Sequence, residues 1–266
     1  MSTGNACFTL GPPEFSPKNY PGLVAWYNVD SAIINNETLD VLGLRDLSPN
    51  VNNLVASNGS IYGADIGYLE FTNNTLINTT PLEFAAPSTG LTVFIVATNN
   101  SDSENYQNYL TIFEDENNNP IKIGIDNVED TIYINLDRAG FIVGNLIPNT
   151  SNIINAICFN SSVDIRFDEV SSAATYQNGV LLYYIDATTI LRINKAINTF
   201  KIIIGDDGSS LEGEQKHTAL NNIIYEIIIY NRVLSESDIS KINRYLGEKY
   251  NIKLENDGNF TYKQDV

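Results

Sequence analysis

The clearest structural signal in the chain is NIIYEIIIYNRVLSESDISKINRYLGEKYNIK, residues 222–253. It begins with a run of isoleucine and tyrosine, and such β-branched and aromatic residues are typical of a strand that is buried on both faces. Ser235 follows as an N-cap, with Asp238 three residues later, and Leu234 and Ile239 are spaced to form a hydrophobic staple. The apolar residues beyond them recur every three or four positions, as they do on one face of a helix. The sequence therefore predicts a core strand that leads into one amphipathic helix.

The rest of the chain contains short apolar runs that are separated by turn residues. Short runs with Gly, Pro, Asn and Asp between them are typical of the strands of an all-β domain. The predicted strands cover residues 22–30, 54–56, 68–71, 75–77, 91–98, 109–113, 121–125, 131–136, 140–146, 153–160, 164–167, 179–185 and 200–205. We therefore predict an all-β fold, which is an antiparallel sandwich or barrel.

The composition limits the class of protein. Of the 266 residues, 43% are hydrophobic and 18% are charged, as in a globular protein. The formal net charge is -17. Binding to nucleic acid or to an anionic membrane requires stripes of Lys and Arg, so neither partner is expected. No apolar run approaches the length of a membrane span, so membrane insertion is not expected either.

The chain is expected to form one domain with two extensions, because no internal repeat or change in composition divides it. Residues 1–21 contain several prolines and are predicted to be an extended N-terminal arm. Residues 22–253 are predicted to be the sandwich domain, and residues 254–266 a C-terminal tail. Arms of this kind often order on a neighbour in an assembly, so a homo-oligomer is expected.

The two cysteines and the N-terminal residues indicate the cellular compartment in which the chain is made. Cys7 and Cys158 lie far apart in dissimilar surroundings, and Cys158 in IINAICF is interpreted as a small buried hydrophobe. Neither a disulfide framework nor a zinc motif is supported. The N-terminal residues show neither the basic nor the apolar region of a signal peptide, so synthesis in a host cytoplasm is expected.

Several segments together carry a resemblance to a known family. They are GLVAWYNVD at 22–30, RDLS at 45–48 with the Asn-rich 50–53, the strand at 68–72, LTVFI at 91–95, the strand end at 204–205, and residues 225–252. The chain resembles the laminin-G-like branch of the concanavalin A-like lectin/glucanase superfamily over about residues 21–253. The resemblance implies an antiparallel β-sandwich (concanavalin A-like jelly roll) with one short C-terminal amphipathic helix. Such motifs specify packing and turns, so they indicate fold more than activity.

The family that the chain resembles includes glycosidases, but the sequence predicts that this chain is not an enzyme. The glucanase branch uses paired carboxylates in a Glu-x-Asp-x-x-Glu strand, and no such strand is found. Glu169 and Glu226 lack the required partners, and Glu226 is interpreted as a structural hydrogen-bonding or edge residue. His217 is the sole histidine and has no nucleophile motif nearby.

Lectin-like members of the family often hold Ca²⁺ at loops rich in Asp, Asn and carbonyl oxygens, so Ca²⁺ is a candidate ion although no cofactor is required. The candidate loops are residues 46–53, 114–119 and 206–214, although such a loop is more often simply a turn. Tyrosines such as Tyr62, Tyr106, Tyr176 and Tyr262 are candidates to stack on sugar rings, whereas Trp26 is interpreted as a core anchor. The predicted ligand-binding residues are Asp46, Asn50, Asn53, Tyr106, Asp206 and Asp207, and the predicted metal ligands are Asp46, Asp206 and Asp207.

Three functions are compatible with these features. The first is a non-enzymatic virion or surface-exposed protein, such as a phage or virus fibre, spike or capsid-decoration subunit, that attaches to a glycan or host surface. The second is a purely structural virion subunit that binds other virion proteins and has no sugar site. The third, a glycoside hydrolase, is the least favoured. A concave patch of aromatic, amide and carboxylate groups would indicate the first, and a flat apolar interface the second.

Overall fold

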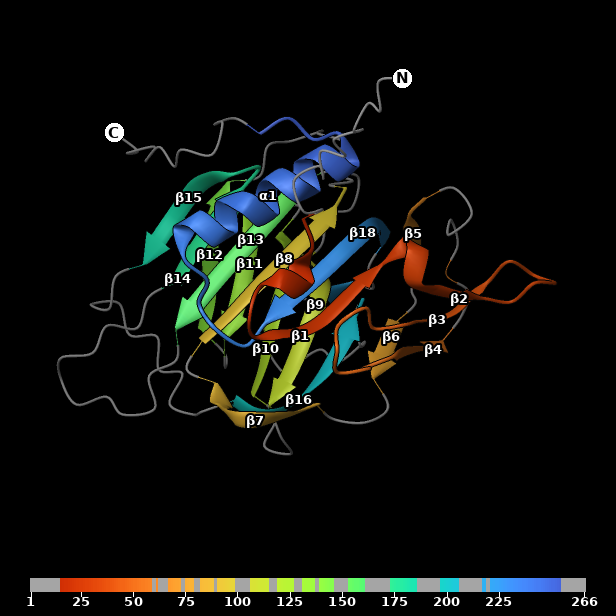
Figure 1. The fold of residues 1–266 in the computed structure, drawn as a ribbon. Helices are drawn as coiled ribbons and strands as arrows, with labels where there is room; N and C mark the ends of the chain where they lie inside the picture. Colours follow the sequence, from red (N-terminus) through yellow and green to blue (C-terminus); the bar gives the residue numbers. More distant parts are fainter. Residues whose placement is uncertain are drawn as a thin grey trace, which may run out of the picture.

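The computed structural model describes residues 15–58, 61, 67–72, 75–78, 82–88, 90–98, 106–114, 119–126, 131–136, 139–145, 153–160, 173–185, 197–205, 217–218 and 221–254. These residues form two packed β-sheets, and one α-helix lies across the outer face of the first sheet (Figure 1). All strand pairs are antiparallel except one short pair. The predicted fold class, an antiparallel β-sandwich with one C-terminal helix, is confirmed.

The first sheet, sheet A, contains the strand that the sequence marks most clearly. In spatial order it consists of β1 (Leu23–Asn28), β18 (Asn221–Tyr230), β8 (Gly90–Ala97), β13 (Ile153–Asn160), β14 (Ala173–Gln177) and β15 (Val180–Ile185). β5 (Leu69–Thr72) pairs with the first half of β18, and β1 pairs with the second half. β18 is therefore an interior strand, with neighbours on both sides.

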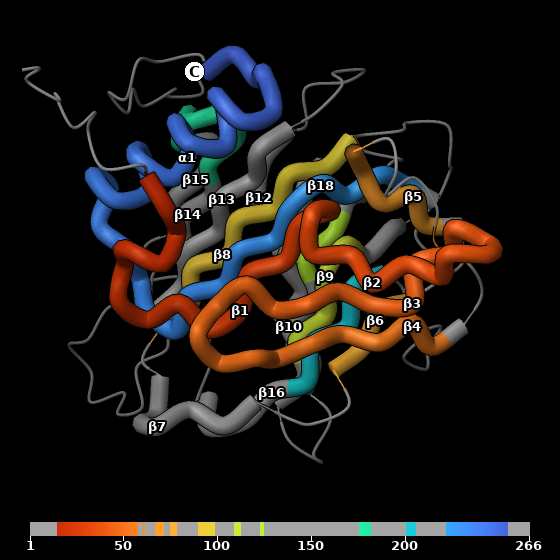
Figure 2. Tube along the Cα trace, turned by 45° about the vertical axis from the view of Figure 1, so that its right-hand side comes forward, coloured from red at the N-terminus to blue at the C-terminus, as the bar shows by residue number. Residues whose placement is uncertain are grey.

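The second sheet, sheet B, is longer. In spatial order it consists of β12 (Ala139–Asn145), β11 (Thr131–Leu136), β10 (Asn119–Asp126), β9 (Tyr106–Glu114), β16 (Ile197–Ile204), β6 (Thr75–Asn78), β4 (Leu54–Asn58), β3 (Val41–Leu44) and β2 (Ala32–Ile34). β7 (Leu82–Ser88) also pairs with β16, and β17 (His217–Thr218) pairs with β9 in parallel. Figure 2 shows β2, β3 and β4 side by side at one end of the molecule.

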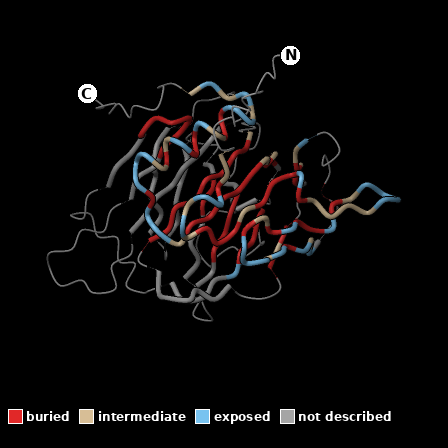
Figure 3. Tube along the Cα trace, in the orientation of Figure 1, coloured by how far each residue is buried: buried red, intermediate tan, exposed pale blue. Residues whose placement is uncertain are grey.

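The main core lies between the two sheets. Leu54, Leu76, Ile95 and Ile229 are almost fully buried there, and all residues of β8 are buried (Figure 3). One tyrosine ties the sheets together through polar contacts, because the Tyr109 hydroxyl of sheet B donates to the carbonyl oxygen of Thr98 at 2.9 Å.

A second apolar layer lies between sheet A and the helix α1 (Glu236–Tyr250). Ile239, Ile242 and Leu246 of α1 pack in one cluster with Phe94 and Ile228 of the sheet. The predicted N-cap is confirmed, since the Ser235 hydroxyl accepts a hydrogen bond from the backbone N–H of Asp238 at 3.2 Å. No helix among the described residues is long and apolar enough to cross a membrane.

Residues 15–21, the described part of the predicted arm, also join this layer. They contain the 3-10 helix η1 (Pro17–Asn19), and the Pro17 carbonyl accepts a hydrogen bond from the Tyr230 hydroxyl at 3.1 Å. Phe15 and Tyr20 pack against the same cluster. The division of the chain into arm, domain and tail stays a prediction.

Most predicted strands are present, and the differences have local causes. The first strand ends earlier than predicted, because the 3-10 helix η2 (Val29–Ser31) begins where Asn28 caps it. β9 begins at Tyr106, three residues before the start of the strand predicted at 109–113. The strands β2, β3, β7, β14 and β17 were not predicted, since they are short or contain weak strand formers such as Ala and Pro. The predicted strand at 164–167 lies outside the described residues.

Candidate functional site

An irregularity in β18 places two consecutive side chains on the outer face of sheet A. β18 pairs with β8 through Ile224 opposite Ala97 and then Glu226 opposite Val96, so Tyr225 is the extra residue of a β-bulge. Ile224 and Ile227 both belong to the core between the sheets. Tyr225 and Glu226 therefore both face α1, although strict alternation would send one of them inward.

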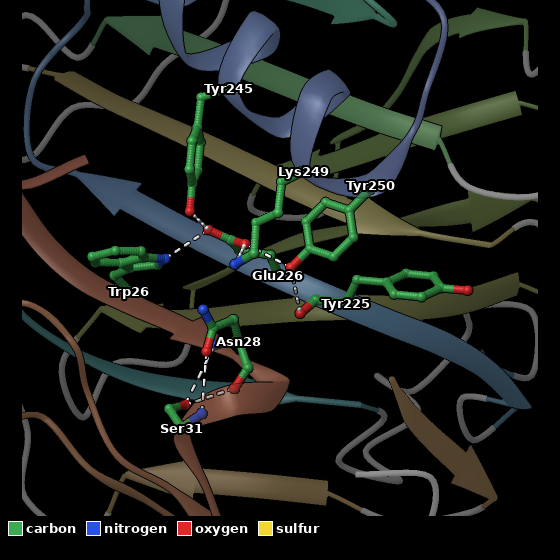
Figure 4. A network of polar contacts seen from close by, with 8 residues as sticks. All are labelled: Trp26, Asn28, Ser31, Tyr225, Glu226, Tyr245, Lys249 and Tyr250. Carbon is green, nitrogen blue, oxygen red and sulfur yellow. Dashed lines mark hydrogen bonds and ion pairs between the residues drawn. The ribbon is translucent and has the colours of Figure 1, made fainter. Parts of the chain in front are cut away.

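Glu226 is the centre of a hydrogen-bond network in this layer (Figure 4). Its Oε1 accepts from the Trp26 indole Nε1 at 2.7 Å and from the Tyr245 hydroxyl at 3.4 Å. Its Oε2 accepts from Lys249 Nζ and from the Tyr250 hydroxyl, both at 2.6 Å. β1, β18 and α1 each supply part of the network, so it joins three elements that are far apart in the sequence.

The network offsets the cost of burying a charge. Glu226 is only 1% exposed, and a carboxylate in such surroundings loses its hydration. Lys249 supplies the opposite charge while its own side chain stays 26% exposed. Burial, followed by the charge of Glu226 and the hydrogen bond to it, raises the pKa of Tyr250 far above its ordinary value. The Tyr250 hydroxyl therefore stays protonated and donates to the carboxylate.

Three half-buried tyrosine rings continue from this network toward β5, and we name Tyr68, Tyr225 and Tyr250 the tyrosine platform. The ring centroids of Tyr225 and Tyr250 are 5.5 Å apart, and those of Tyr68 and Tyr225 are 6.1 Å apart. Lys249 Nζ lies 5.2 Å from the centre of the Tyr250 ring. The platform thus combines aromatic surface with an ammonium group at its border.

The predicted ligand Asp46 lies in a different place, in the turn that follows β3. It is 9% exposed, and its Oδ1 accepts from the backbone N–H groups of Trp26 and Ser48 at 2.9 and 2.8 Å. Its Oδ2 accepts from the Ser48 hydroxyl at 2.6 Å and from the Asn52 N–H at 2.9 Å. The carboxylate therefore holds the turn to β1, and the chain itself occupies both of its oxygens.

Two other predicted ligands take part in the same turn. Asn53 Oδ1 accepts from the Asp46 N–H at 3.0 Å, and Asn50 Nδ2 donates to the Leu23 and Val24 carbonyls at 3.0 Å each. The structure thus brings Asp46, Asn50 and Asn53 together as a clamp on β1. Their predicted role toward a sugar or Ca²⁺ stays a prediction.

The structure does not describe the side chains of the other three predicted ligands. Tyr106 begins β9, and its side chain lies outside the described part. Asp206 and Asp207 lie outside the described residues altogether. Within the described residues, no group of three or more His, Cys, Asp or Glu side chains is arranged to hold a metal ion.

The sequence pointed only partly to the Glu226 network. The interpretation of Glu226 as a hydrogen-bonding residue is confirmed, but the edge alternative is wrong, since β18 is an interior strand. Trp26, interpreted as a core anchor, is half-buried and donates to Glu226. The available signal was a single carboxylate within a run of isoleucines, which requires a partner of opposite charge somewhere in the chain.

Comparisons with known proteins identify similar folds. No family model matches the chain, and no curated protein matches its sequence. Trypanosoma rangeli sialidase aligns with a TM-score of 0.56 at 13% identity, over 88% of this chain and 34% of the sialidase chain. The same sialidase in complex with sialic acid gives a TM-score of 0.55 at 12% identity, over 90% and 35%. The binding domain of botulinum neurotoxin serotype D/C VPI 5993 gives 0.54 at 15% identity, over 85% and 52%.

These matches bear on fold and on one earlier prediction. At such identities they show a shared β-rich fold, and this chain spans about a third of the sialidase chains and about half of the neurotoxin chain. The prediction that the chain is not an enzyme is corrected, because enzymes, the sialidases, are among the proteins with this fold. The absence of a Glu-x-Asp-x-x-Glu strand argues only against the paired-carboxylate mechanism of the glucanase branch, and not against other enzyme mechanisms.

Proposed function

We propose that this chain is a carbohydrate-recognition domain of the concanavalin A-like type, which attaches to glycans. The observation that carries the proposal is the half-buried aromatic cluster on the outer face of sheet A, next to the charged pair of Glu226 and Lys249. A sugar ring has apolar faces that stack on aromatic rings and hydroxyl groups that need hydrogen-bond partners, and binding sites combine both kinds of group.

The comparisons support this proposal at the level of fold. One matching structure is a sialidase in complex with sialic acid, and another is described as the binding domain of a neurotoxin. Both contain more chain than this protein, so their whole activities are not transferred to it. Glycans with and without sialic acid are therefore equally suitable first probes.

A glycan array of the purified, folded protein tests the proposal. The array is run once with Ca²⁺ and once with a chelator. Saturable binding to a defined set of glycans is expected, and its loss on chelation would assign a Ca²⁺ site as well. Absence of binding in both conditions, from protein whose far-UV circular dichroism shows a β-fold, would contradict carbohydrate recognition.

A structural assembly subunit is the second candidate, and exposed apolar residues on sheet B favour it. Leu42 and Val55, on the adjacent strands β3 and β4, are 49% and 45% exposed. For either function, we propose that the chain lies on a virion surface and that it self-associates. Light scattering after size-exclusion chromatography tests the self-association, and a dimer that dissociates in a Leu42→Ser, Val55→Ser variant would favour the assembly role.

A further inference from the structure

We infer that the tyrosine platform of Tyr68, Tyr225 and Tyr250 is a stacking subsite for one pyranose ring. This inference rests on the proposed function, which starts from the same aromatic cluster, and it adds which three rings hold the ligand and that the ligand is one sugar unit. It differs from the predicted site, because none of the predicted ligands belongs to the platform.

The arrangement of the rings suits a single ring-shaped ligand. Tyr68 and Tyr225 are inclined at 66°, and Tyr225 and Tyr250 at 57°. Inclined rings form a wall at the side of each neighbour instead of one flat surface. A pyranose that stacks on one ring would therefore touch the edge of the next, which limits the subsite to one sugar unit.

The β-bulge shows that the platform is built into the sheet. Without the extra residue, alternation along β18 would direct Tyr225 to the core when Glu226 faces α1. Bulges re-aim side chains in this way and are over-represented near functional sites. The register of β18 is thus interrupted at the point where two neighbouring side chains are both needed on the outer face.

The buried carboxylate below the platform is a second, independent indication. Replacing a buried ion pair by apolar residues is often neutral or stabilising, so the pair of Glu226 and Lys249 is not explained by stability alone. Glu226 fixes the Tyr250 hydroxyl at 2.6 Å, and it holds Lys249 Nζ at the border of the platform. Lys249 is partly exposed, so its ammonium group can donate to a hydroxyl or carboxylate oxygen of a sugar.

The single tryptophan of the chain provides a direct readout. Trp26 Nε1 shares the Glu226 carboxylate with Tyr250, so binding at the platform is expected to change the fluorescence of this one indole. The protein is titrated with lactose, sialyllactose, maltose and chitobiose. We compare the wild type with Tyr68→Ala and Tyr225→Ala, and with Tyr20→Ala as a matched control. Tyr20 is also half-buried in the outer layer, but its ring contacts Phe15 and not the platform.

The expected result is saturable binding of at least one probe by the wild type and by Tyr20→Ala, with about tenfold weaker binding by each platform variant. Equal affinity in all four proteins, each folded by circular dichroism, would overturn the inference and leave the proposed function intact. A positive glycan array together with no binding of the four probes would also overturn the inference alone. A negative array would remove the proposed function and the platform together.

Discussion

Glu226 is a carboxylate within a run of isoleucines, and its burial explains most of the local structure around it. A buried charge is tolerated when an opposite charge and enough donors surround it. Lys249 and the Trp26, Tyr245 and Tyr250 donors meet this requirement. The side chains that resemble a binding site are therefore also the side chains that allow Glu226 to be buried within β18.

Replacing Glu226 by Gln tests this account of the network. The amide keeps the size of the side chain, but it removes the charge that pairs with Lys249 and leaves the buried donors with a weaker acceptor. We expect the free energy of unfolding to fall by about 3 kcal/mol, measured by urea denaturation. Glu248→Gln is the control, because Glu248 is an exposed residue of α1 and should change stability by less than about 0.5 kcal/mol. Equal shifts in the two variants would contradict a charged network.

The buried tyrosines predict how stability depends on alkaline pH. The pKa values of Tyr27, Tyr109, Tyr230 and Tyr250 are all raised, in each case chiefly by burial. Below a pH of about 10, folded and unfolded chains both keep these protons, so the tyrosines add no pH dependence. Above that pH the unfolded chain ionises first, and stability falls by about 1.4 kcal/mol per pH unit for each tyrosine.

Tyr250→Phe isolates one of these contributions. The variant loses one ionisable group, so the decline of its unfolding free energy above a pH of about 10 should be shallower by about 1.4 kcal/mol per pH unit. Urea denaturation at a series of alkaline pH values measures the slope in both proteins. An unchanged slope would show that Tyr250 ionises as readily in the folded chain as in the unfolded one.

At the scale of elements, the turn after β3 acts as a clamp on the first strand. Asp46→Ala removes the acceptor for the N–H groups of Trp26, Ser48 and Asn52. We expect a loss of about 3 kcal/mol in unfolding free energy, because buried donors are left without a partner. Glu37→Ala, at an exposed position between β2 and β3, is the control.

A measurement of thermal stability distinguishes the structural role of Asp46 in this turn from the metal-binding role predicted from the sequence. If Asp46 serves only the turn, the thermal midpoint of the wild-type protein is expected to be equal in Ca²⁺ and in chelator. A midpoint that rises with the Ca²⁺ concentration would show binding to the folded state and support the metal role.

The elements differ in how far the sequence predicts them. β18 and α1 were predicted closely, since both carry strong local signals, and the Ser235 cap was identified correctly. β14 and β7 were not predicted, because AATYQ and LEFAAPS contain few strong strand formers and depend on their neighbours for pairing. The β-bulge at Tyr225 was also not predictable, since the apolar run around it shows no break in pattern.

At the scale of the whole molecule, the candidate site depends on contacts between distant parts of the chain. Trp26 and Glu226 are 200 positions apart. Neither residue type alone indicates the other, so only the pairing of β1 with β18 brings them together. Residue types could be predicted from local patterns, whereas the site follows from topology.

β18 also links the two apolar layers of the molecule. Ile227 and Ile229 pack in the core between the sheets, and Ile228 and Tyr230 pack under α1. A strand shared in this way should make the layers unfold together as one cooperative unit. The helix would then be part of the stability of the sandwich, and not an appendage that melts first.

Two matched cavity variants test this cooperativity. Ile242 of α1 and Leu54 of β4 are both 0% exposed, one in each layer. Ile242→Ala and Leu54→Ala should each lower the unfolding free energy by about 2–5 kcal/mol. Because the layers share β18, Trp26 fluorescence and far-UV circular dichroism should give the same urea midpoint in each variant. A fluorescence midpoint below the circular dichroism midpoint in Ile242→Ala alone would show that the outer layer unfolds separately, and the platform would then be lost before the sandwich.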